Sequence, residues 1–112
     1  MYTVRKKVII SSAHFLPGYK GKCKEVHGHN WKVWVTCQSD RLNSQGMVVD
    51  FSEIKKILNK FDHKMINDFL PLGITPTAEN LAKYFCDIIP KCIRIEIEEN
   101  EGSTAIYEKS GE

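Results

Sequence analysis

The sequence of 112 residues predicts an α+β fold, with a single antiparallel sheet that carries two helices on one face. Three observations lead to this prediction. Segments that alternate apolar and polar residues come in two pairs, one near each end of the chain, and two segments with helical periodicity lie between the pairs. Strands and helices grouped in this way are typical of α+β folds, whereas regular alternation of the two is typical of α/β folds.

The first pair of strands is predicted at residues 4–15 and 31–38. In the second of these segments, WKVWVTCQ, every odd-numbered position is apolar, as expected for the two-residue repeat of a strand. The intervening stretch HFLPGYKGKCKEV contains one proline and two glycines. This composition favours a long hairpin loop.

Two helices are predicted in the middle of the chain, at residues 52–61 and 77–89. Each carries apolar residues three and four positions apart, so one face of each helix can pack on the sheet. Asp50, followed by Glu53, is a candidate N-cap of the first helix. Pro90 ends the second helix.

The last two strands are predicted at residues 92–99 and 103–108, joined by the turn Asn100-Glu101-Gly102. Isoleucines alternate with arginine and glutamate in the first of them, so one of its faces meets solvent. The helices cover one side of the sheet. The other side is left for solvent, a ligand or another subunit.

Length and composition indicate one domain, residues 1–112, with a modest core. A net charge of +2, with both signs mixed along the chain, gives no electrostatic case for binding nucleic acid. No apolar run approaches membrane-spanning length and the N-terminus has no signal-peptide pattern, so we expect no membrane partner and a cytoplasmic location. The four cysteines form no CxxC pair and are expected to be free thiols.

Three of the four histidines form a candidate metal centre. His27 and His29 are two residues apart, so in a strand both imidazoles project to one face, with Gly28 between them. On its own this pair is explained as often by exposed or core histidines. His14, on the preceding strand, can supply a third ligand across the hairpin and favours the metal. Three imidazole ligands with one open position are typical of catalytic zinc, so Zn²⁺ is the predicted cofactor.

Cys23 lies four residues before His27, in the predicted hairpin loop, and three interpretations of it stay open. It is an inert thiol, a fourth ligand that closes the zinc site, or a nucleophile or base beside the metal. A zinc ion together with Lys22 and Lys24 would lower the pKa of this thiol, as the third interpretation requires. The lysines at 20, 22 and 24 are either a solvated loop or an anion-binding stretch.

Asp62 and His63 place a carboxylate beside an imidazole after the first helix. A carboxylate can fix an imidazole's tautomer and raise its basicity, but adjacent side chains do not always face each other, so a polar helix end is an equal alternative. Glu99 belongs to a run of acidic residues, and such a run is usually a solvated face. Five further residues are predicted to pack rather than to do chemistry: Cys37, Cys86, Cys92, Trp31 and Trp34.

Taken together, these motifs resemble the 6-pyruvoyltetrahydropterin synthase superfamily, and most closely its queuosine-pathway branch, the 6-carboxy-5,6,7,8-tetrahydropterin synthases. The matching stretches span nearly the whole chain in the family's order: SSAHFLPGYKGKCKEVHGHNW, GMVVDFSEIK, FDHKMIND, TPTAENLA and EENEGSTAIYE. The resemblance implies the tunnelling fold (T-fold), a four-stranded antiparallel sheet with two helices on one face. It also implies that subunits join their sheets edge to edge into an oligomeric barrel, usually a homohexamer built from two trimers.

The resemblance assigns a role to each matching residue. The three histidines would hold zinc, and Cys23 would be the thiolate that abstracts a proton. Asp62 and His63 would complete a Cys-Asp-His relay whose members come from different subunits. Glu99 would anchor the pterin ring through paired hydrogen bonds. Two residues would line the pterin pocket, Thr77 and Glu79.

The substrate that the resemblance implies is 7,8-dihydroneopterin triphosphate. On charge alone, the lysines at 20, 22 and 24 are predicted to face its triphosphate. The carboxy-forming branch releases acetaldehyde and triphosphate and leaves 6-carboxytetrahydropterin. Three residues separate Cys23 from the His-Gly-His motif, as in carboxy-forming bacterial enzymes, whereas the animal pyruvoyl enzymes have a longer insert. A folate-related branch has glutamate where this chain has Lys24, with Glu25 one place later. The alternatives are a 6-pyruvoyltetrahydropterin synthase on the same substrate and a non-catalytic zinc- or pterin-binding module.

Overall fold

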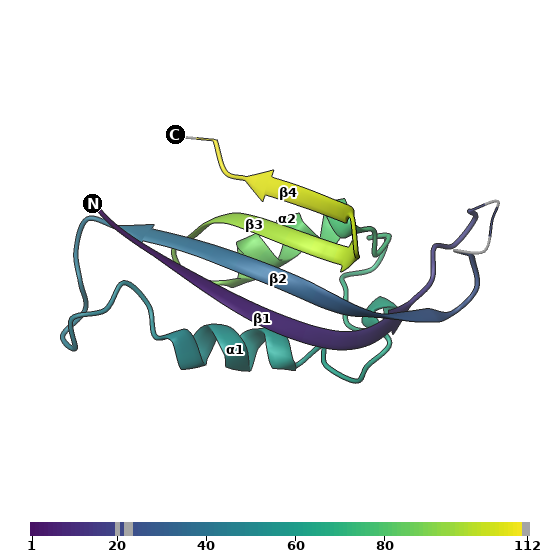
Figure 1. Cartoon of the computed structure of the whole chain (residues 1–112), viewed down its shortest axis with the longest axis horizontal. Coiled ribbons are helices and arrows are strands. Elements are labelled where there is room, and N and C mark those ends of the chain that lie inside the picture. Colours follow the sequence, from purple (N-terminus) through teal and green to yellow (C-terminus); the bar gives the residue numbers. More distant parts are fainter. Residues whose placement is uncertain (20, 22–23, 111–112) are drawn as a thin grey trace.

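A computed structural model describes residues 1–19, 21 and 24–110. Its four strands form one antiparallel sheet in the order β1-β2-β3-β4, with the helices on one side (Figure 1). The strands are β1 (Tyr2–His14), β2 (His27–Ser39), β3 (Cys92–Asn100) and β4 (Ser103–Glu108), and the helices are α1 (Phe51–Asn59) and α2 (Ala78–Ile88). The predicted fold class and the order of the elements are confirmed.

The core lies between the sheet and the two helices. Helix α1 packs along β1, and α2 packs across β3 and β4 (Figure 1). Even-numbered residues of β1 and odd-numbered residues of β2 point to this side, because side chains alternate along a strand. The largest fully buried side chains include Ile10, Trp31, Ile54, Leu58, Leu81, Phe85, Ile95 and Ile97.

Three of the packing residues predicted from the sequence are buried cysteines, Cys37, Cys86 and Cys92. Burial raises the pKa of Cys86 to about 12, and a hydrogen bond with Cys37 is the main reason why the pKa of Cys92 is also raised. Thiols that stay protonated are poor nucleophiles. Cys86 and Cys92 therefore act as small apolar groups in the core, as predicted. Cys37 is fully buried with them, although its hydrogen bond with Cys92 lowers its pKa.

The two tryptophans of β2 have different surroundings. Trp31 is buried in the core as predicted, but Trp34 lies on the open face of the sheet. There the Arg5 guanidinium carbon and the Lys7 ammonium lie 5.9 Å and 5.4 Å from the Trp34 ring centroid. Cations at this distance from an indole attract its negative face. Trp34 is thus a surface residue that orders two basic side chains of β1.

Both helices begin at side-chain caps. The Asp50 carboxylate accepts a hydrogen bond from the Ser52 N–H at 2.9 Å, so Asp50 is the predicted N-cap of α1. The Thr77 hydroxyl oxygen accepts one from the Asn80 N–H at 3.1 Å, and this makes Thr77 the N-cap of α2 rather than its first residue. Within the described part of the chain, no helix has both the length and the apolarity needed to span a bilayer.

The segment after α1 has more structure than the sequence indicated. It runs beside the end of β1, where Ala13 pairs with Met65 in a parallel bridge, and it includes a short 3-10 helix, η2 (Ile66–Asp68). Ile66 is buried in the core and holds this segment against the sheet. The end of β1 is therefore supported on one side by β2 and on the other by residues 63–67.

Candidate metal centre and adjoining pocket

The three predicted histidine ligands lie together at one end of the sheet, on the side that faces the helices. His14 is the last residue of β1 and is paired with His27, the first residue of β2, while His29 follows two residues later on the same face. Strand β2 starts four residues earlier than predicted, so the whole His-Gly-His motif is in the sheet. The ring centroids lie 4.4 Å (His14–His27), 4.8 Å (His27–His29) and 5.1 Å (His14–His29) apart.

Backbone carbonyls fix the orientation of two of the imidazoles. His14 Nδ1 lies 2.9 Å from the Pro76 carbonyl oxygen, and His27 Nδ1 lies 2.8 Å from that of Glu25. Because a carbonyl only accepts hydrogen bonds, each Nδ1 carries the proton and each Nε2 keeps its lone pair. Histidine ligands of metals are commonly held in this way.

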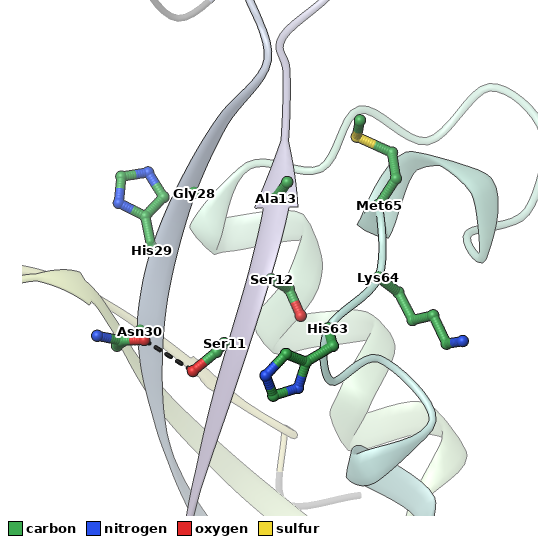
Figure 2. Close-up of a pocket in the computed structure, with 9 residues that line it drawn as sticks. All are labelled: Ser11, Ser12, Ala13, Gly28, His29, Asn30, His63, Lys64 and Met65. Carbon is green, nitrogen blue, oxygen red and sulfur yellow. Dashed lines mark hydrogen bonds between the residues drawn. The ribbon is translucent and has the colours of Figure 1, made fainter.

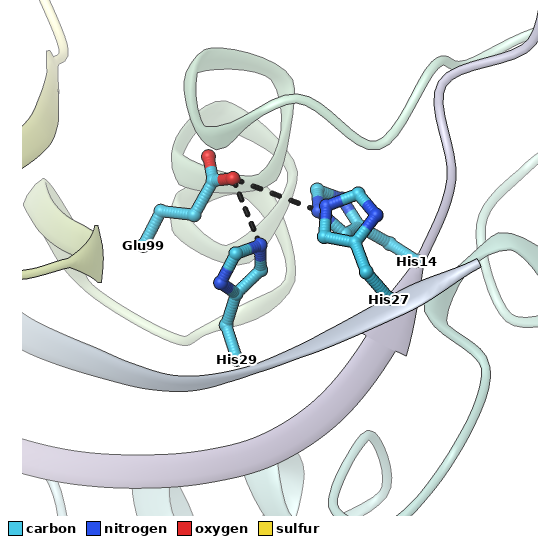
Figure 3. A group of neighbouring side chains, drawn as sticks. All are labelled: His14, His27, His29 and Glu99. Carbon is cyan, nitrogen blue, oxygen red and sulfur yellow. Dashed lines mark ion pairs between the residues drawn. The ribbon is translucent and has the colours of Figure 1, made fainter. Parts of the chain in front are cut away.

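Glu99 brings a carboxylate to the same point. Figure 3 shows its side chain directed at the histidines from the end of β3, and Oε1 lies 3.0 Å from His29 Nε2 and 3.7 Å from His14 Nε2. One donor atom from each of the four residues lies within 4.8 Å of the others. Glu99 was not among the metal ligands predicted from the sequence. Ile95 and Ile97 point toward the core, and Glu99 is two residues further along the same strand. This alternation could have predicted that Glu99 points to the same side as the histidines.

Burial shapes the electrostatics of this cluster. His14 is 1% exposed, and burial lowers its pKa below 6.5, against the opposing effects of its hydrogen bond to Pro76 and the charge of Glu99. Burial also lowers the pKa of His29, again with Glu99 opposing the shift. A neutral imidazole is the form that binds a metal. Burial therefore favours the neutral, metal-binding form of His14 and His29.

The donor set fits a divalent transition metal. Imidazole nitrogens and one carboxylate oxygen are the ligands that such ions accept in proteins. His14 Nε2 is buried and has no hydrogen-bond partner among the described residues, an arrangement that costs free energy unless an electrophile binds there. Trp31 supports the site from beneath, with its ring centroid 4.8 Å from that of His14. The four residues could hold a metal ion.

The metal-free protein is expected to lose stability as the pH falls below about 6.5. The lowered pKa values mean that the unfolded chain binds protons on His14 and His29 that the folded chain does not, so unfolding becomes more favourable on acidification. The limiting slope is about 1.4 kcal/mol per pH unit for each imidazole. Urea titrations between pH 7.5 and 5.5 measure it, and the variant His14→Gln should reduce the slope. A pH-independent unfolding free energy over this range would contradict the prediction.

Asp62 and His63 do face each other. His63 Nδ1 lies 2.9 Å from Asp62 Oδ2, and the His63 backbone is left-handed (φ 56°), which turns its ring back toward the preceding carboxylate. Ser11 holds both residues, because its N–H donates to Asp62 Oδ1 at 2.8 Å and its carbonyl accepts from the His63 N–H at 2.6 Å. The hydrogen bond from Ser11 is the main reason why the pKa of Asp62 is lowered, with His63 adding to it. The carboxylate therefore stays charged beside the imidazole.

A pocket of about 520 Å³ lies between His63 and the paired ends of β1 and β2. Figure 2 shows His63 and Lys64 beside β1 and His29 on the far side of β2, with the two strands between them. His63 is 81% exposed, so its ring is open to a ligand or to a second subunit. The complete lining is Ser11, Ser12, Ala13, Gly28, His29, Asn30, His63, Lys64 and Met65.

The other predicted site residues are spread more widely. Thr77 follows Pro76, whose carbonyl holds His14, so it lies close to the cluster, whereas Glu79 is exposed in the first turn of α2. Lys24 is exposed. Cys23, Lys20 and Lys22 lie outside the described residues, so their predicted roles stay predictions.

Comparisons with known proteins agree with the fold and show the family. The 6-pyruvoyl tetrahydropterin synthase family matches residues 3–110. A protein of Archaeoglobus fulgidus is 40% identical over 103 residues, covering 85% of each chain. The 6-carboxy-5,6,7,8-tetrahydropterin synthase of Bacillus subtilis is 31% identical over 123 residues, covering 95% of this chain and 84% of its own. The structure of the Caenorhabditis elegans 6-pyruvoyl tetrahydropterin synthase has a TM-score of 0.76 at 24% identity, covering 97% of this chain and 96% of that one.

The match over nearly all of the chain shows the class of protein. The chain belongs to the 6-pyruvoyl tetrahydropterin synthase family, whose members are lyases that act on a small-molecule pterin. The family resemblance seen in the sequence is therefore confirmed, and the sheet with its two helices is the T-fold.

Proposed function

We propose that this chain is a zinc-dependent 6-carboxy-5,6,7,8-tetrahydropterin synthase, with residues 1–112 acting as one domain. It converts 7,8-dihydroneopterin triphosphate and water to 6-carboxytetrahydropterin, acetaldehyde and triphosphate, for queuosine and other 7-deazapurines. The observation that carries a metal-dependent lyase is the convergence of His14, His27 and His29, two of them oriented by backbone carbonyls. The carboxy-forming product is supported by the name of the Bacillus subtilis relative, which is 31% identical across 95% of the chain.

The three histidines and the Asp62–His63 pair have separate tasks in this proposal. His14, His27 and His29 hold zinc, which when bound supplies Lewis acidity toward the substrate's side-chain hydroxyls and so acidifies neighbouring C–H and O–H groups. Asp62 accepts a hydrogen bond from the Nδ1–H of His63 and leaves Nε2 free to take up or release a proton. Cys23 is assigned as the base that abstracts a substrate proton.

Glu99 is assigned to the pterin ring. A carboxylate offers two parallel acceptors to the ring's guanidine-like edge, and the charge strengthens both hydrogen bonds. Its contacts with His14 and His29 support an anchor beside the proposed metal, where it would orient the substrate side chain toward the zinc. Thr77 and Glu79 are assigned to the wall of the same pocket.

Product analysis tests the reaction. Zinc-loaded protein is incubated with 7,8-dihydroneopterin triphosphate, products are identified by mass spectrometry, and acetaldehyde is measured in the same sample. A 6-carboxytetrahydropterin mass with acetaldehyde supports the proposal. A 6-pyruvoyl product without acetaldehyde supports the second candidate, a 6-pyruvoyltetrahydropterin synthase, which the family match and the Caenorhabditis elegans structure favour. Absence of turnover in zinc-loaded protein would support the remaining alternative, a non-catalytic zinc- or pterin-binding module.

The assembly we propose is a homohexamer of two trimeric barrels. Within each barrel, neighbouring subunits are joined through the edge strands β1 and β4. In β1 the backbone groups of Ser11 point outward to Asp62 and His63, so by alternation those of Ile9 and Lys7 also point outward. In β4 the outward groups belong to Ile106 and Glu108, because Lys109 N–H bonds inward to β3. One antiparallel register then pairs Ile9 with Ile106 and Lys7 with Glu108 of a second copy. Both isoleucines are 53% exposed, so the pairing covers apolar surface.

If each site takes Cys23 from one subunit and Asp62 with His63 from another, two inactive variants should complement each other. Cys23→Ala and His63→Ala are each expected to be inactive, and co-expression should restore about a quarter of wild-type activity, because random assembly leaves that share of sites intact. Activity per oligomer is measured on hexamers isolated by size-exclusion chromatography.

The matched control for complementation is the mixture of Asp62→Asn with His63→Ala. These two residues are adjacent in one chain and joined by a hydrogen bond, so no mixed oligomer contains an intact site formed from both variants. Mixed hexamers of Cys23→Ala and His63→Ala that stay inactive would show that the site does not cross between subunits.

A further inference from the structure

Strand β1 ends at His14, the most buried of the candidate ligands. The last pair of the β1–β2 ladder is His14 with His27. The N–H and carbonyl of Phe15 follow this pair and, like those of Ser11, point away from β2, which does not hold them. Strand ends without hydrogen-bond partners open readily, and opening at this point would displace a ligand.

The side chain of Asn67 provides the partner that the sheet does not. The Phe15 N–H donates to Asn67 Oδ1 at 3.1 Å, and Asn67 Nδ2 donates to the Phe15 carbonyl at 3.0 Å. A carboxamide presents an acceptor and a donor in one plane, so it can satisfy both backbone groups of one residue as a neighbouring strand would. Asn67 itself is in η2, which Ile66 anchors in the core.

His14 is thus held from both of its neighbours in the chain. On the N-terminal side, the Ala13 N–H donates to the Lys64 carbonyl at 3.0 Å. On the C-terminal side, Asn67 holds Phe15. The Pro76 carbonyl fixes the ring through Nδ1. Residues 64–67 therefore form a support for one ligand, and Asn67 contacts the strand end through its side chain, which makes this contact testable by substitution.

We propose that Asn67 is a positioning residue of the metal centre, which clamps the backbone of Phe15 and so holds His14 in place for the metal. Both of its hydrogen bonds go to Phe15, and its effect on the metal is exerted through His14. The proposal rests on the proposed function in one respect, that the three histidines bind the metal. The clamp itself is a feature of the metal-free fold.

The test compares cobalt binding by wild type, Asn67→Ala and Asn67→Asp. Alanine removes both hydrogen bonds, and aspartate keeps the acceptor but sets a carboxylate oxygen against the Phe15 carbonyl. We expect Co²⁺ to bind about tenfold more weakly to both variants, as for other groups that orient metal ligands, with an altered d–d absorption spectrum. Hydrogen exchange of the Phe15 amide, measured by NMR without metal, should be faster in both.

The matched control is Asn43→Ala. The Asn43 carboxamide also makes two hydrogen bonds to the backbone, both as acceptor from the Gln45 and Met47 N–H groups, but in the turn before α1. This variant should lose stability while keeping the cobalt affinity and spectrum of wild type.

Unchanged cobalt affinity and spectrum in both Asn67 variants would overturn the proposal. If Asn67→Ala does not fold, Asn67→Asp carries the comparison. Wild-type protein that binds no cobalt would instead contradict the proposed function, and the clamp is then decided by exchange alone. Faster exchange of Phe15 in the Asn67 variants supports the clamp, and unchanged exchange refutes it.

Discussion

Replacing His14 with glutamine is expected to weaken zinc binding at least about 100-fold and to abolish turnover, since one of three imidazole ligands is lost. Glutamine is chosen because its amide can still donate to the Pro76 carbonyl, which His14 Nδ1 contacts at 2.9 Å. The buried site is then filled, and loss of metal is not confused with loss of fold. Metal content of purified protein and competition with a chromophoric chelator measure the change.

The same substitution at the fourth histidine is the control. His63 lies outside the metal cluster and is 81% exposed, so His63→Gln should retain zinc while losing turnover. Equal zinc affinity in His14→Gln and wild type would exclude His14 as a ligand. Loss of zinc in both variants would show that the cluster of His14, His27 and His29 is not the whole site.

The spacing of the histidines could be predicted because it depends on local geometry alone. Residues two apart in a strand share a face, so His27 and His29 had to point together, and a hairpin brings His14 opposite His27. The same alternation extends to Glu99 from Ile95 and Ile97. Among the neighbouring acids Glu99 looks like one more solvated charge, so only the family resemblance selected it, as the pterin anchor.

The relation between Asp62 and His63 was left open in the sequence and depends on tertiary structure. Adjacent side chains in a strand diverge, and these two meet because His63 has φ 56°, a conformation that only a few per cent of non-glycine residues adopt. The hydrogen bonds with Ser11, which is 51 residues away from Asp62, hold that conformation. No local pattern records such a contact.

The groups that hold the metal ligands in place could not be predicted from the sequence either. The carbonyl of Pro76 and the side chain of Asn67 reach the end of β1 only because the segment between the helices runs back along that strand. Backbone carbonyls have no residue signature, and no local pattern links Asn67 to Phe15, which lies 52 residues away. Ligand types are thus visible in a sequence, whereas the groups that orient them require the fold.

Glu99→Gln is expected to lower kcat/KM at least about 100-fold with zinc still bound. The glutamine is isosteric, but it sets one N–H donor against the donors of the pterin edge, and the loss of a charged acceptor costs about 3 kcal/mol, which corresponds to that factor. The matched control is Glu98→Gln on the open face, where Glu98 Oε1 lies 3.6 Å from Lys32 Nζ. An exposed pair of this kind contributes little, so turnover should change less than about twofold.

The zinc content of the Glu99 variant separates two roles for this carboxylate. Glu99 Oε1 lies 3.0 Å from His29 Nε2, close enough to serve as a fourth ligand rather than as a substrate anchor. Three imidazoles should hold the metal without it, so an anchor predicts full zinc occupancy and a loss confined to substrate turnover. Zinc lost in parallel with activity would make Glu99 a ligand, and wild-type turnover would exclude both roles. Chelator competition and steady-state kinetics on one preparation distinguish the three results.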